Sequence, residues 1–128
     1  MEELSPNCVT FSQVDRAFMH LFRTIQFQCF GDAGITHQIQ EIPNKKGHIF
    51  RINVKRPDGE YQFTYNEEEE KFFLKDDSEE NAQDKELDYS SAYELSHEIT
   101  TILNNETQKN ATAIAQKVQE QIKDVVTK

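Results

Sequence analysis

Apolar residues near the start of the chain recur at the spacing of an α-helix. They form one stripe, which is typical of a helix that covers a hydrophobic core. Thr10 and Gln13 match a capping box, in which the threonine side chain caps the helix and the glutamine reaches back to it. The stripe comprises Val14, Phe18, Leu21, Phe22 and Ile25. We therefore predict an N-terminal helix that begins after Thr10.

After Gly34 the pattern changes to the period of two that is typical of β-strands. Residues 35–42, 48–55, 61–65 and 71–75 are the strand candidates. The sequence Pro57-Asp58-Gly59 predicts a tight turn, since proline presets φ and glycine adopts positive φ. We therefore predict an antiparallel meander of three to four strands.

The alternation in the two central strands also predicts their register. Apolar side chains of both strands share one face only if Val54 lies opposite Tyr61, with the other pairs following, or if the register shifts by two residues. A shift of one residue would turn one strand's apolar side chains to water. In the first register Ile52 lies opposite Phe63, and Phe50 opposite Tyr65.

Two further helical stripes follow at the C-terminal end. Ser91 and Glu94 have capping-box spacing, Asn104 and Asn105 predict a break, and Thr107 can cap the final helix. One long helix bent at the asparagines is the alternative. The final helix carries a narrow apolar stripe, which fits either the core or a seam for a partner helix. The seam alternative predicts a homodimer. The stripe comprises Ile114, Val118, Ile122 and Val125.

Together these elements predict an α+β fold: an N-terminal helix, a three- to four-stranded antiparallel meander and two C-terminal helices. The chain has 128 residues. That length suits a single domain spanning residues 1–128 with one core.

The negative charge is concentrated in one segment. The net charge is -9, and residues 67–88 hold eleven acidic residues against three lysines. Within this segment we predict a mobile linker over 76–88 that contains little apolar surface. The acidic run is a solubilising linker, a docking site for a basic protein, or a loose site for a divalent cation. The candidate partner-binding residues are Glu67, Glu68, Glu69, Glu70, Asp76, Asp77, Glu79 and Glu80.

The sequence disfavours several classes of protein. No apolar run is long enough to span a membrane, and the N-terminus does not look like a signal peptide. The acidic balance argues against direct binding of nucleic acid. Cys8 and Cys29 lack CxxC spacing, so we expect reduced thiols and a cytoplasmic location. Glu94 and His97 stand one helical turn apart, but one such pair is too little for a metal site.

No catalytic, cofactor-binding or metal-binding motif stands in the sequence. We therefore expect a small non-enzymatic protein-interaction module, such as an adaptor, a chaperone-like factor or a regulator. One alternative is an inhibitor that occupies a nucleic-acid-binding protein by imitating phosphate charge with residues 67–88. The other is an enzyme whose site is assembled from dispersed residues. The candidates for that site are His48, Tyr65, Tyr89 and His97.

Overall fold

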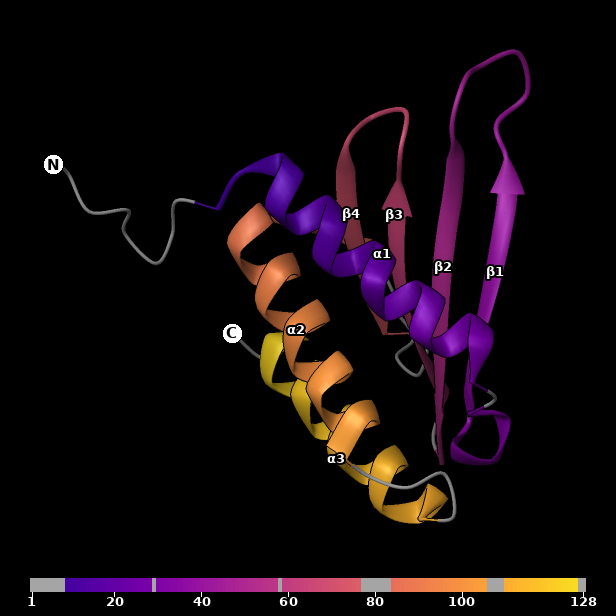
Figure 1. Ribbon diagram of the computed structural model, residues 1–128, viewed down its shortest axis with the longest axis vertical. Helices are drawn as coiled ribbons and strands as arrows, with labels where there is room; N and C mark the ends of the chain where they lie inside the picture. The colour runs from indigo at the N-terminus through magenta and orange to yellow at the C-terminus, as the bar shows by residue number, and fades with distance from the viewer. Residues whose placement is uncertain (1–8, 29, 58, 77–83, 106–109, 127–128) are drawn as a thin grey trace, which may run out of the picture.

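Three helices and a five-stranded antiparallel sheet make up the fold. The computed structural model describes residues 9–28, 30–57, 59–76, 84–105 and 110–126. Each strand pairs with its neighbour in sequence, and Figure 1 shows α1 crossing in front of the strands, with α2 packed on α1 and α3 packed on α2. The elements are α1 (Phe11–Phe27), a short 3-10 helix η1 (Gly31–Ala33), β1 (Ile35–Glu41), β2 (His48–Arg56), β3 (Gly59–Asn66), β4 (Lys71–Asp76), β5 (Asp84–Leu87), α2 (Tyr89–Asn105) and α3 (Ala111–Val126). The predicted α+β class is confirmed, with one strand more than expected.

The N-terminal helix begins where the capping box predicts. The Gln13 backbone N–H donates to the Thr10 hydroxyl at 3.2 Å, and the Thr10 N–H donates to the Gln13 side-chain oxygen at 2.9 Å. These bonds satisfy backbone donors that lack a partner inside the helix. All five residues of the predicted apolar stripe are buried.

The central strands pair in the first of the two predicted registers, with Val54 opposite Tyr61. Their apolar side chains meet α1, because the Phe18 ring lies 5.0 Å from that of Phe63, nearly perpendicular to it. Tyr65 stacks on Phe72 of the next strand with ring centroids 4.5 Å apart. We call this apolar side of the sheet the helix face. The opposite side, which carries mostly polar residues, is the polar face.

The fifth strand lies in the segment that we predicted to be a linker. Asp76 is the last residue of β4, and residues 84–87 pair with β4 as β5. Leu87 explains this difference, because it lies opposite Phe72 and is only 5% exposed. One buried leucine can hold a short edge strand whose other side chains face water. Residues 77–83 of the expected linker lie outside the described residues.

The C-terminal part forms two separate helices, and the predicted break at Asn104 and Asn105 is confirmed, since α2 ends at Asn105. The predicted Ser91 cap is wrong. The Ser91 N–H instead donates to the Asp88 carboxylate at 2.7 Å, and the helix begins at Tyr89. Aspartate is as good a cap as serine, and it lies three residues earlier. Thr107 lies outside the described residues.

Candidate interaction surface

One edge of the sheet is formed by β1. It pairs with β2 on one side, and no strand in the described ranges pairs with its other side. Only Ile35 of its seven residues is buried. The strand contains no lysine, arginine or proline, and its acidic residue, Glu41, is the last one. Natural edge strands use lysine, proline, bulges or short length to prevent pairing with other chains, so β1 is an unprotected edge in the part of the chain that the structure describes.

The hydrogen bonds between β1 and β2 determine which backbone groups face outward. The Lys55 N–H donates to the Gly34 carbonyl at 2.8 Å. Because bonded and non-bonded pairs alternate along an antiparallel ladder, Thr36, Gln38 and Gln40 also bond to β2. The residues between them direct their backbone groups to the free edge. These outward groups are the N–H of His37, Ile39 and Glu41 and the carbonyls of Ile35, His37, Ile39 and Glu41.

The start of β1 is held firmly in place. Gly34 adopts φ 77°, and a Cβ there would lie 3.0 Å from the Lys55 Cβ, so this close approach requires glycine. The Ile35 N–H donates to the Phe30 carbonyl at 3.2 Å. Further along, the Asn53 side-chain N–H donates to the Gln38 side-chain oxygen at 3.3 Å. The free edge is therefore presented by a strand that is well anchored on its inner side.

Exposed apolar side chains accompany this edge. Among the described residues, two large hydrophobic side chains are exposed: Ile39, at 48%, and Phe27, at 80%. Ile39 belongs to β1, and Phe27 is the last residue of α1. The end of α1 lies beside β1 (Figure 1), where the Phe22 and His37 rings meet edge to face at 5.4 Å. We call β1 together with Phe27 the β1 edge.

The predicted acidic site does not form one patch among the described residues. Residues 67–70 form the turn before β4, whereas Asp76 ends that strand, so the two groups are separated by its length. Both groups have cationic neighbours of the same chain. Glu68 lies 3.8 Å from the Lys45 ammonium, and Asp76 forms an ion pair with Arg56.

Glu67 also contacts a residue of its own chain, His48. Its carboxylate accepts the His48 backbone N–H at 2.9 Å and lies 3.7 Å from that residue's ring nitrogen. Glu69 and Glu70 are exposed in the same turn. The other three predicted acidic residues, Asp77, Glu79 and Glu80, lie outside the described residues.

The stripe of the final helix lies inside the chain's own core. Ile114, Val118 and Ile122 have no exposed side-chain surface, and Val125 is partly buried against them. α3 packs on α2, β2 and η1. Its narrow stripe needs no partner helix, because three elements of the same chain already cover it. Of the two readings that the sequence left open, burial supports the core.

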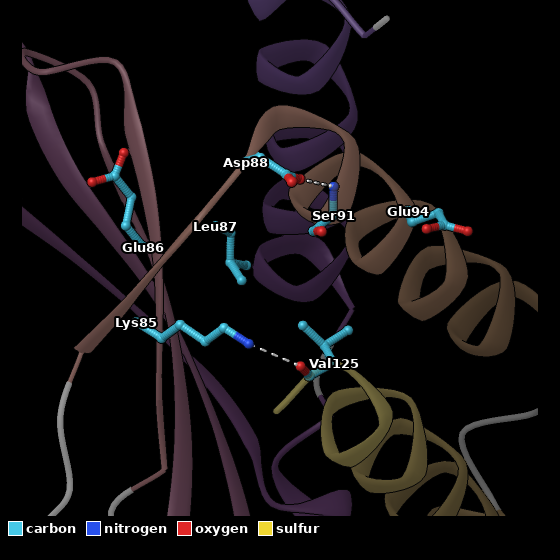
Figure 2. A pocket seen from close by; sticks show the side chains of 7 residues that line it. All are labelled: Lys85, Glu86, Leu87, Asp88, Ser91, Glu94 and Val125. Carbon is cyan, nitrogen blue, oxygen red and sulfur yellow. Dashed lines mark hydrogen bonds between the residues drawn. The ribbon is translucent and has the colours of Figure 1, made fainter. Parts of the chain in front are cut away.

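A small cavity lies where β5, α2 and α3 meet (Figure 2). Its volume is about 170 Å³. The Lys85 ammonium reaches the Val125 carbonyl at 3.3 Å, near the C-terminal end of α3, where a cation is favourable. Asp88 is engaged in capping α2, and Glu86 points away on the other side of its strand. The polar groups of this cavity therefore join elements of the fold rather than converge on a substrate.

The four dispersed residues considered for an enzyme do not come together in the cavities that we find. His48 lines a cavity beside the turn between β1 and β2, and Tyr89 lines another beside the β3–β4 turn. His97 is exposed on α2 and stacks on Tyr93. Tyr65 is buried in the core. Within the described residues, no group of three or more histidine, cysteine, aspartate or glutamate side chains could hold a metal ion.

Tyr65 illustrates a polar group that serves the core. Its hydroxyl donates to the Asp15 carboxylate at 2.7 Å, which joins β3 to α1. Burial is the main reason why the pKa of Tyr65 is raised above 10.0, and the hydrogen bond to Asp15 raises it further. A buried phenol that keeps its proton acts here as a structural hydrogen-bond donor.

No protein-family model, no curated protein and no solved structure matches the chain. In the part of the chain that the structure describes, no helix is long and apolar enough to cross a membrane. The candidate site therefore rests on the geometry of the β1 edge.

Proposed function

We propose that this chain is a non-enzymatic protein-interaction module that binds other polypeptides along the β1 edge. The observation that carries the proposal is the unprotected edge itself. A seven-residue strand with six exposed residues directs backbone donors and acceptors outward, and Ile39 and Phe27 stand exposed beside it. An extended segment can add to such an edge by backbone hydrogen bonds, with side-chain contacts giving specificity.

The charge-mimic alternative has less support. A phosphate mimic needs a run of carboxylates that are available to a basic partner. Glu68 lies beside Lys45 and Asp76 pairs with Arg56, and the Glu67 carboxylate accepts the His48 backbone N–H. No observation on the described residues favours this function over the first.

The enzyme alternative likewise has no specific observation in its favour. A general base must lie within hydrogen-bond reach of the group that it deprotonates. His48 and Tyr89 line different cavities, and the Tyr65 hydroxyl is committed to Asp15.

The test is affinity capture from a lysate of the native host, with mass spectrometry of the bound proteins. The bait is compared with Ile39→Lys, which places a charge on the β1 edge, and with Glu86→Lys, a matched control on the opposite edge strand. We expect capture to be lost with Ile39→Lys and kept with Glu86→Lys.

Capture that persists with Ile39→Lys would contradict the proposed site. Capture that instead weakens steeply with salt, and disappears when residues 67–70 carry glutamine, would favour the charge-mimic function.

A further inference from the structure

We infer that the β1 edge pairs with the β1 edge of a second copy, antiparallel about a twofold axis at Gln38. This inference rests on the proposed function, because it names the polypeptide that occupies the same edge. The joined molecule would have one continuous sheet of two five-stranded halves. Twofold pairing of this kind is isologous, so the same surface serves both copies.

The backbone groups of β1 are self-complementary in this arrangement. With Gln38 on the axis, His37 lies opposite Ile39 of the second copy, and Ile35 lies opposite its Glu41. His37 and Ile39 both direct their N–H and carbonyl outward, so each such pair exchanges two hydrogen bonds. The Glu41 N–H meets the Ile35 carbonyl of the second copy. The Ile35 N–H needs no partner there, because it already donates to the Phe30 carbonyl of its own chain. Every outward N–H of β1 thereby finds an acceptor.

The side chains are also compatible with self-pairing. Residues opposite each other in a sheet point to the same face, so Gln38 meets Gln38, and Thr36 meets Gln40, on the polar face. On the helix face Ile39 comes beside His37 of the second copy. No two like charges stand opposite each other, since Glu41 is the strand's only acidic residue and it faces Ile35. A random partner strand would not be expected to meet all these conditions.

The arrangement also places the exposed Ile39 side chain between the two copies. A twofold axis perpendicular to the sheet places the helices of both copies on the same side of the joined sheet. The two α1 ends then flank the axis, because α1 ends beside β1 (Figure 1). Ile39, one of the two exposed large hydrophobic side chains among the described residues, thus lies where the copies meet, and α1 ends at Phe27 on the same side of the sheet.

Pairing of this kind stops at two copies. In the described residues each chain offers one long edge, β1, and the dimer uses the β1 strands of both chains. The remaining edge, β5, has only four residues, three of them charged. The association is therefore closed and should not extend into fibres.

The first test measures the mass of the protein in solution by sedimentation equilibrium, from low micromolar to submillimolar concentration. We expect the mass to rise from 15.0 kDa towards twice that value. Ile39→Pro removes an outward N–H, which proline tolerates on a free edge, and should raise the dimer dissociation constant about tenfold or more. A mass that stays at one chain, or a dimer that Ile39→Pro leaves unchanged, would overturn the inference.

A charge-swap pair separates loss of the interface from loss of folding. Gln38→Lys and Gln38→Glu each place like charges opposite each other at the axis, and each should weaken the homodimer about fivefold. An equal mixture of the two should form a heterodimer at least as tight as the wild-type dimer. Failure of the mixture to associate, with both variants folded by circular dichroism, would contradict a twofold axis at Gln38.

The outcomes also separate this inference from the proposed function. A protein that stays monomeric but captures a lysate protein in an Ile39-dependent way retains the function and loses the second copy as occupant. A monomer whose capture ignores Ile39→Lys loses both.

Discussion

The two edges of the sheet are built differently. β1 has seven residues and β5 has four. The outward backbone groups of β1 belong to Ile35, His37, Ile39 and Glu41, of which only the last residue is acidic. Bonded and non-bonded pairs alternate along each ladder, and the strand registers extend this alternation from β1 to β5. On β5 the outward backbone groups belong to Asp84 and Glu86, so a strand that approaches β5 meets two acidic residues.

This difference shows how one sheet can have both a protected and an open edge. Short length and charge are common devices against unwanted pairing, and β5 has both. β1 has neither. The open edge is therefore specific to β1, because the other edge of the same sheet is protected.

The largest expected effect tests whether α3 offers a competing interface. Ile122→Lys should destabilise the fold by about 4 kcal/mol, because it buries a charge at a position with no exposed surface. Urea unfolding of the variant measures the loss. If α3 were a solvent-facing seam, the variant would keep wild-type stability, and the β1 edge would no longer stand alone as the interface.

The next effect tests which backbone groups of β1 face outward. Gln38→Pro removes an N–H that bonds to β2 and should cost about 3 kcal/mol in the free energy of unfolding. Ile39→Pro removes an outward N–H and should cost well under half as much in the monomer. The comparison is made by urea unfolding at low protein concentration. Equal losses would show that the assigned alternation is wrong.

On the opposite edge, Leu87 should hold β5 in place. Leu87→Ala should lower the free energy of unfolding by about 2 kcal/mol, because its side chain is buried opposite Phe72. Glu86→Ala, at the exposed neighbouring position, should change it by less than about 0.5 kcal/mol. Thermal unfolding monitored by circular dichroism measures both. Similar effects of the two variants would mean that β5 is not anchored through its leucine.

A smaller effect than that of Leu87→Ala is expected at the centre of the sheet, away from both edges. Tyr65→Phe removes the hydrogen bond to Asp15 and should cost about 1 kcal/mol. It should leave dimerisation unchanged, since the side chain lies in the core.

The same variant changes the response to pH. The pKa of Tyr65 is raised in the folded chain by burial and by Asp15, so the folded state holds this proton more tightly than the unfolded state. This contribution is fully present below the ordinary pKa of 10.0 and is lost as pH rises above it. Stability measured by urea unfolding should fall above about pH 10, and less steeply in Tyr65→Phe. Equal slopes would contradict this assignment.

Local patterns predicted much of the fold. Thr10 and Gln13 fixed the start of α1, and alternation predicted the pairing of Val54 with Tyr61. These features depend on neighbours in the sequence or on one hairpin, so a single sequence contains them. The cap at Asp88 was missed because serine and aspartate are equally good caps, and Ser91 lay closer to the apolar stripe.

The candidate site was much harder to predict. Residues 35–42 read as a strand, but whether a strand lies at an edge depends on pairing along the whole sheet. β5 was missed because only Leu87 faces the core, so no alternation is visible over its four residues. The stripe of α3 looked too narrow for a core because the sequence does not show that α2, β2 and η1 together cover it. Tertiary pairing, rather than local pattern, determines all three features.

The central claim is that the outward backbone groups of β1 pair with a second copy. Amide hydrogen exchange followed by NMR at low and high protein concentration tests it residue by residue. The account predicts that the amides of His37, Ile39 and Glu41 exchange rapidly in dilute protein and become protected at high concentration. The amides of Thr36, Gln38 and Gln40 should be protected throughout, and those of Asp84 and Glu86 at neither concentration. Rapid exchange of the Ile39 amide at every concentration would contradict the account.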